Sequence, residues 1–261
     1  MEKLLTNKYF AAYQSSLGLN LNDLLEQVKK QDWTIENFKF YTAVSVMSSS
    51  RIEGETLEID SYLKHKLQDI EYLPNLTEKP NDLFVAYEFA RDNQLTLPNF
   101  YEAHSIATKH LLQQTQRGVV RTGNMLIMEQ YTNRIQYEAA SGTLVKQEFT
   151  RFWDELDKLL HSKINTEEVF YYASLIHLVF VKIHPFNDGN GRTGRLLEKW
   201  FFSSLLGEKA WYIGSEHYYY NNIKAYYHNL ARIGLFYEEL DYEKSLPFLL
   251  MLPQSLIIKK D

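Results

Sequence analysis

The chain has 261 residues, 45% of them hydrophobic and 23% charged, with a net charge of −5, which is ordinary globular usage in a chain long enough to bury a sizeable core. It contains no cysteine, which excludes a disulfide framework, thiolate catalysis and a cysteine-based zinc site. Lysine and arginine are scattered along the chain, so the sequence predicts no basic face and no nucleic-acid partner.

Helical spacing of apolar residues dominates the chain in its sequence order. Helices are predicted at residues 22–30, at 33–49, in an apolar segment around Phe84 and Tyr87 that ends near Asp92, at 98–113, from Asn165 onward, and at about 192–206. Three signals locate helix ends: Thr96 is a candidate N-cap, Glu168 completes a capping-box pair with Asn165, and Gly207 suits the residue after the last helical turn.

The two ends of the chain carry no membrane signal. Residues 1–17 include polar side chains throughout and lack the apolar core of a signal peptide. The apolar tail at residues 247–258 is interrupted by Pro253 and is too short to cross a bilayer. These features predict a soluble cytoplasmic protein with no membrane partner.

One region has the pattern of strands. An apolar run at residues 125–128 precedes a predicted turn at 131–134, and residues 135–137 return. The predicted fold is therefore all-α, a helical bundle with one small β-hairpin. We divide the chain into an N-terminal helical extension (1–80), a core (81–235) and a C-terminal helical tail (236–261).

The segment 184–195, with the sequence HPFNDGNGRTGR, joins two predicted helices. Gly189 and Gly191 flank Asn190 just before the second helix, where backbone N–H groups can converge on an anion. The helix N-terminus adds partial positive charge at the same place. Arg192 and Arg195 are three residues apart, so both can face one polyanion.

Two further side chains of this segment suit reactions of phosphates. Asp188 offers the hard oxygen ligand that Mg²⁺ shares with phosphates. His184 can act as a general base near neutral pH. Together with the anion-binding groups, these residues indicate phosphoryl or nucleotidyl transfer.

Two other phosphate-binding motifs are similar to part of this segment. Gly189, Gly191 and Gly194 spell G-x-G-x-x-G, but a dinucleotide-binding fold needs several parallel strands, and the sequence predicts almost none. A P-loop fails because Arg195 and Leu196 stand where Lys and Ser or Thr are required.

The segment matches every specified position of H-x-F-x-[D/E]-G-N-G-R-x-x-R, so it resembles the motif of the Fic family. The resemblance extends over about residues 83–230. His104 and the stretch from Gly118 to Arg121 are similar to the family's sequence before its hairpin. Tyr226 and Tyr227 resemble its tyrosine pair near the nucleotide base, although Ile223 stands where the family often has Arg.

This resemblance implies a protein adenylyltransferase, which moves AMP from ATP to a Ser, Thr or Tyr hydroxyl of a protein target that can be the enzyme itself. His184 would deprotonate the hydroxyl, Phe186 would anchor the loop, and Asp188 would hold Mg²⁺ (or Mn²⁺). Nucleotide binding would fall to Asp188, Gly189, Asn190, Gly191, Arg192, Arg195, Tyr226 and Tyr227. The branch of the family that transfers phosphate has Lys in place of Gly191, so Gly191 favours AMP transfer.

The predicted hairpin looks like the family's flap, which would dock an extended target segment along Met125, Leu126, Ile127 and Met128. An ordinary hairpin that closes the core explains the same residues equally well.

Residues 49–54 read S-x-x-x-E-G, which resembles the inhibitory motif of Fic proteins that carry their own brake. Ser49 and Glu53 are one helical turn apart, so both can face the active site. The resemblance implies that Glu53 pairs with Arg195 and takes the space of the γ-phosphate. By itself, such a pair is more often a solvated Ser and Glu on a helix surface.

Two alternative functions use the same residues. The first is a nucleotide-sensing regulator whose ATP-binding core acts through a partner. The second is an enzyme that removes AMP from a modified protein, with Glu53 activating water. Three other histidines are expected to have no catalytic or metal-binding role. His177 is expected to be a hydrogen-bonded core residue. His217 and His228 have no ligand-like neighbours in the sequence.

Overall fold

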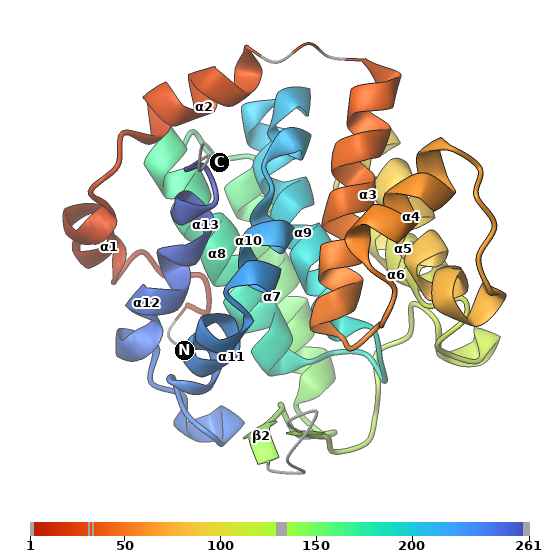
Figure 1. Ribbon diagram of the computed structural model, residues 1–261. Helices are drawn as coiled ribbons and strands as arrows, with labels where there is room; N and C mark the ends of the chain where they lie inside the picture. The colour runs from red at the N-terminus through yellow and green to blue at the C-terminus, as the bar shows by residue number, and fades with distance from the viewer. Residues whose placement is uncertain (1–2, 31, 33, 129–134, 258–261) are drawn as a thin grey trace.

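The computed structural model describes residues 3–30, 32, 34–128 and 135–257, which are mostly helical (Figure 1). The longer helices are α3 (Ile35–Ile52), α5 (Pro74–Asp92), α6 (Leu97–Ala107), α7 (Val145–Leu160), α8 (Thr166–Ile183) and α9 (Asn190–Leu206). The shorter ones are α1 (Phe10–Leu17), α2 (Leu21–Lys29), α4 (Ile59–Leu67), α10 (Ser215–Asn221), α11 (Ile223–Ala231), α12 (Leu246–Leu249) and α13 (Met251–Gln254).

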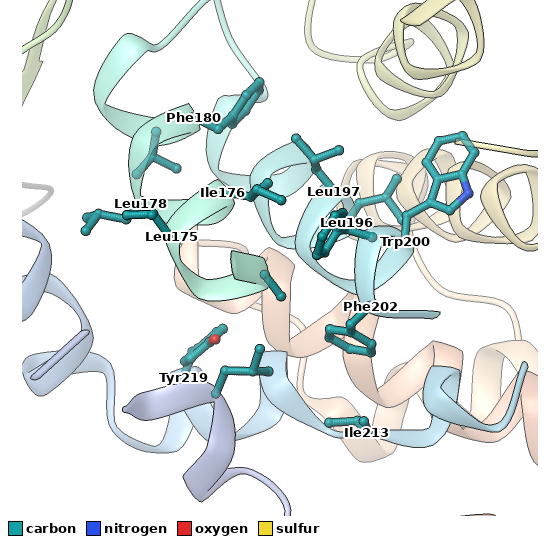
Figure 2. Packing of buried hydrophobic residues seen from close by; sticks show 14 of the residues in the cluster. Leu175, Ile176, Leu178, Phe180, Leu196, Leu197, Trp200, Phe202, Ile213 and Tyr219 are labelled. Atoms are coloured by element: carbon teal, nitrogen blue, oxygen red, sulfur yellow. The ribbon is translucent and has the colours of Figure 1, made fainter. Parts of the chain in front are cut away.

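Helices α8 and α9 form the centre of the bundle. Every residue of α8 from Val169 to Ile183 is buried, as expected for a helix that is apolar on all sides. Figure 2 shows Ile176 of α8 beside Leu196 and Leu197 of α9, all within one buried cluster. The loop that joins these helices is therefore held between two deeply buried helices.

A buried ion pair between α9 and α10 also contacts helix α3. The Lys199 ammonium of α9 contacts the Glu216 carboxylate of α10 at 2.6 Å and donates to Ser45 Oγ of α3 at 2.9 Å. Tyr87 of α5 donates to the same carboxylate at 2.7 Å. These contacts tie four helices together and place the C-terminal end of α3 beside the start of α9.

Several predicted helix ends are confirmed. Thr96 Oγ1 accepts from the Asn99 N–H, and Asn165 with Glu168 forms a complete capping box. Gly207, at φ 94°, ends α9. Helix α5 ends at Asp92 as predicted, and the expected domain boundary at residue 80 lies inside this helix.

Other predicted ends were wrong. The helix expected at 98–113 ends at Ala107, because Thr108, at φ −112° and ψ 16°, leaves the helical conformation. The helix expected to end at residue 49 continues to Ile52. Helix α9 begins at Asn190, two residues earlier than predicted, directly after Gly189 in the left-handed conformation.

The hairpin consists of β1 (Leu126–Met128) and β2 (Ile135–Glu138), paired antiparallel with an irregularity after Ile127. The turn predicted at 131–134 lies outside the described residues, as does Trp33. Within the described ranges this is the only sheet, so the prediction of an all-α bundle with one small hairpin is confirmed. No helix in the described part of the chain is long and apolar enough to span a membrane.

Candidate active site

A pocket of about 230 Å³ opens where the α8–α9 loop meets the end of α3. Among the described residues it is lined by Glu53, Glu55, Lys79, Leu111, His184, Asp188, Gly189, Asn190, Gly191 and Arg192. The structure thus brings half of the predicted 184–195 segment to one cavity, together with the carboxylates of Glu53 and Glu55, which follow α3.

The loop begins at His184, whose φ of 53° and ψ of 61° end α8 in the left-handed region. Such a conformation is unusual for a residue other than glycine and needs support from its surroundings. Phe186 supplies that support, because it is fully buried and stacks on His104 with ring centroids 3.7 Å apart. The Asn190 side chain accepts from the Phe186 N–H at 2.9 Å and donates to its carbonyl at 2.8 Å. Asn190 therefore offers its backbone, rather than its amide, to a ligand.

His104 supports the loop, and the sequence analysis identified it only through the family resemblance. Its Nε2 donates to the Asp188 carbonyl at 3.0 Å, and its Nδ1 accepts from the Gly118 N–H at 2.9 Å. Burial lowers the pKa of His104 to about 4. The ring is neutral near pH 7 and links α6 to the pocket wall.

Arg121 is a second supporting residue. It is 2% exposed and donates to the carbonyls of His184 at 2.7 Å, Ala140 at 2.6 Å and Ile183 at 3.2 Å, as well as to Gly123. The guanidinium therefore joins the base of the hairpin to the turn at His184. Its sequence position gives no periodic signal, because its partners are backbone atoms distant along the chain.

His184 has the protonation state that a general base needs. Its Nδ1 lies 3.1 Å from the Val181 carbonyl oxygen and 3.2 Å from the Tyr137 hydroxyl. Since a carbonyl oxygen only accepts, the ring proton belongs on Nδ1, and Nε2 keeps its lone pair. Burial lowers the pKa of His184 to about 4, against a smaller opposing effect of the Val181 hydrogen bond.

The start of α9 provides anion-binding groups. Gly189, at φ 79°, turns the chain into the helix, so the first amides of α9 face the pocket without intrahelical partners. Asp188 is exposed at the pocket wall, and its Oδ1 accepts from the Gly189 N–H at 2.6 Å. No group of three His, Asp or Glu side chains suited to a metal occurs in the described ranges. One carboxylate beside an anion site fits Mg²⁺ that is held jointly by the protein and phosphates.

Glu53 and Ser49 both accept hydrogen bonds from the Arg195 guanidinium. Arg195 Nη2 donates to Glu53 Oε1 at 2.6 Å, and its Nε donates to Ser49 Oγ at 2.8 Å. A Cβ added to Gly191 would collide with the same Glu53 oxygen. The carboxylate therefore lies directly over the first turn of α9, in the position where an anion would bind.

The surrounding charges keep Glu53 ionised. Burial raises the pKa of this carboxyl, but the charges of Arg195 and Arg192 and the hydrogen bond from Arg195 outweigh burial, so the net pKa lies below its ordinary value. One third of the side chain, 33%, is still exposed to solvent. Glu53 is thus an ionised group that can move away without crossing the core.

The tyrosine pair does not line this pocket among the described residues. The Tyr226 hydroxyl lies behind Arg195, 3.2 Å from its Nη1 and 3.0 Å from Nε2 of His177. The Tyr227 hydroxyl donates to the Ile52 carbonyl at 2.8 Å. Both tyrosines contact the groups around the Glu53–Arg195 pair. His177 is a hydrogen-bonded core residue, as predicted.

Comparison with known proteins finds a match to one family model and several solved structures of similar fold. Residues 94–202 match the model of the Fic/DOC family. A Fic family protein from Desulfovibrio desulfuricans G20 has a TM-score of 0.74 at 19% identity, covering 98% of this chain and 72% of that one. A Fic domain containing signaling protein from Bacteroides thetaiotaomicron VPI-5482 gives 0.65 at 19%, with 90% and 93% covered. Fic-1 from C. elegans gives 0.66 at 17%, with 94% and 70% covered.

Proposed function

We propose that this chain, whose residues 94–202 match the model of the Fic/DOC family, transfers AMP from ATP to a hydroxyl of a protein target. The observation that carries the proposal is that His184, with an unprotonated Nε2, lines the same pocket as the start of α9. A base and an anion site on one cavity are what nucleotidyl transfer to a hydroxyl requires.

His184 performs the proton transfer in this mechanism. Nε2 accepts the proton of the target hydroxyl as its oxygen forms a bond to the α-phosphorus. The bond from that phosphorus to the oxygen bridging the α- and β-phosphates breaks, and pyrophosphate leaves. A positioned base of this kind contributes about 10²- to 10⁴-fold.

The start of α9 binds the phosphates. The amides after Gly189, with Arg192 and Arg195, orient the nucleotide for in-line attack. Asp188 would hold Mg²⁺ or Mn²⁺ against the phosphates, and the ion would supply charge neutralisation there. Gly191 leaves the backbone open to close approach by an anion.

Glu53 holds the enzyme in an inhibited state. Its carboxylate engages Arg195 and covers Gly191, so the γ-phosphate and Glu53 compete for one guanidinium. Ser49 of α3, the helix that Glu53 follows, accepts a further hydrogen bond from Arg195. In this scheme residues 1–80 carry the brake, 81–235 the catalytic core and 236–261 a supporting tail.

The hairpin docks the target segment. Its side chains Leu126, Met128 and Ile135 are 52%, 47% and 48% exposed, which is unusual for large apolar residues beside a catalytic loop. The Tyr137 hydroxyl lies 3.2 Å from His184 Nδ1, so a target paired along β1 would lie close to the base.

Removal of AMP is a second candidate, favoured by one observation. Glu53 and His184 line the same pocket, so a water held by the Glu53 carboxylate would lie within the site. In that case Glu53→Gln would abolish release of AMP from a modified protein while increasing AMP transfer.

The position of the label in ATP tests the proposal. The Glu53→Gly variant is incubated with a lysate, Mg²⁺ and ATP labelled at the α- or the γ-phosphorus. Relative to the same lysate without the variant, we expect additional covalent label on protein from α-labelled ATP only. Label from γ-labelled ATP would indicate phosphate transfer, and no covalent label from either would favour a nucleotide-sensing regulator.

A further inference from the structure

Glu55, outside the 184–195 segment, bridges two cations at the pocket wall. Its Oε1 accepts from Arg192 Nη2 at 2.9 Å and from Lys79 Nζ at 3.1 Å. All three residues line the pocket, and they come from the turn after α3, from α9 and from α5. An acidic oxygen within reach of an ammonium and a guanidinium is also the arrangement that a phosphate oxygen adopts.

Arg192 still has hydrogen-bonding capacity in this arrangement. Its side chain is only 5% exposed, and its buried Nε has no hydrogen-bond partner among the described residues. A buried charged N–H without an acceptor is costly. The resting protein thus leaves a donor beside Glu55 that a ligand with several oxygens can satisfy.

We propose that Lys79 and Arg192 together bind the outer phosphates of the nucleotide, and that Glu55 occupies their shared site in the resting protein. This inference rests on the function proposed above and adds a binding residue from α5. The ligand chemistry is a diphosphate group, present in ATP and in the pyrophosphate that leaves. AMP lacks that group, so Lys79 distinguishes ATP and pyrophosphate from AMP.

If the Glu55 bridge is purely structural, Lys79→Met should change nucleotide affinity in the opposite direction. If Lys79 only holds Glu55 over Arg192, then Lys79→Met loosens the turn and strengthens nucleotide binding, as removal of Glu55 does. If Lys79 is a phosphate ligand, the same substitution weakens binding. The difference is clearest in a Glu55→Ala background, where the bridge is already absent.

The experiment is calorimetric titration of the full chain with ATP, pyrophosphate and AMP in the presence of Mg²⁺. Glu55→Ala is compared with Glu55→Ala/Lys79→Met and Glu55→Ala/Lys79→Arg. Because Lys79 is 38% exposed, we expect Lys79→Met to weaken ATP and pyrophosphate binding about three- to tenfold. AMP binding stays unchanged, and Lys79→Arg retains most of the affinity.

Two surface variants serve as controls. Lys64 pairs with Asp60 at 2.6 Å on α4, so Lys64→Met removes a lysine charge away from the pocket. Glu58 pairs with Arg51 at 2.9 Å in the same turn as Glu55, so Glu58→Ala removes a comparable carboxylate. Neither changes nucleotide affinity, and thermal unfolding verifies that each variant is folded.

The outcomes separate the inference from the proposed function. ATP affinity that is equal or higher after Lys79→Met in the Glu55→Ala background overturns the role of Lys79 and leaves AMP transfer intact. An equal loss for AMP overturns the assignment to the outer phosphates. If no variant binds ATP, Glu53→Gly included, the proposed function fails and the inference fails with it.

Discussion

At the scale of single residues, the proposed chemistry depends on one neutral imidazole, that of His184. Burial lowers the pKa of His184 to about 4, and its Nδ1–H bond to Val181 leaves Nε2 as the acceptor. We expect His184→Ala, made in the Glu53→Gly background, to lose about 10²- to 10⁴-fold in AMP transfer. ATP affinity changes little, because His184 holds a proton and no phosphate. Transfer of α-label and calorimetric ATP titration measure the two quantities, and normal transfer would refute the proposed base.

Arg121 holds that imidazole in place without touching the reacting atoms. Arg121→Met leaves the carbonyls of His184, Ala140 and Ile183 without their donor. Each unsatisfied buried group costs about 1–3 kcal/mol, so with three carbonyls we expect a loss of about 3–9 kcal/mol in the free energy of unfolding. Arg121→Lys keeps the charge but reaches fewer carbonyls, so its free energy of unfolding should lie between those of the unchanged protein and of Arg121→Met. Urea unfolding measures the loss, and a change below about 1 kcal/mol would exclude this role.

At the scale of elements, the buried pair of Lys199 and Glu216 joins α9 to α10, and Lys199 also donates to Ser45 of α3. Both side chains of the pair are at most 1% exposed. Lys199→Met leaves the carboxylate of Glu216 uncompensated, which costs about 3–5 kcal/mol, whereas Lys199→Met/Glu216→Gln recovers much of that loss. The exposed pair of Lys244 and Asp241 is the control, because Lys244→Met changes stability by about 1 kcal/mol or less. Equal effects of the two single variants in denaturant titrations would contradict this account.

Elements defined by local sequence were predictable. Helix α8 could be predicted from its apolar periodicity, its capping box at Asn165 and the motif that follows it from His184. The end of α6 was not predictable, because no glycine or proline near Thr108 marks it in the sequence.

Contacts between distant elements were also beyond pattern reasoning. Arg121 reaches backbone carbonyls 19 to 63 residues away, and backbone atoms leave no trace in the sequence. Glu55 meets Arg192 across 137 residues. The pairing of Glu53 with Arg195, in contrast, was expected because a family pattern already joins the two segments.

At the scale of the whole molecule, buried neutral histidines make stability depend on pH. The pKa of His104 falls from 6.5 to about 4 on folding, so the unfolded chain takes up this proton first as the pH falls. Its stabilising contribution is complete above pH 6.5 and is lost between 6.5 and about 4, by about 3 kcal/mol. His184 adds a loss in the same window. Urea unfolding across this range measures the effect, and a flat profile would contradict neutral burial of both rings.

The most direct measurement of the central claim is the rate of AMP transfer by Glu53→Gly relative to the unchanged protein. Charge-assisted hydrogen bonds such as that between Glu53 and Arg195 contribute about 1.5–3 kcal/mol. Release of Arg195 should therefore raise α-label incorporation, including incorporation into the protein itself, about ten- to a hundred-fold. Glu53→Gly/His184→Ala should be silent, because release of the brake cannot replace the base. An unchanged or lower rate for folded Glu53→Gly would contradict the account.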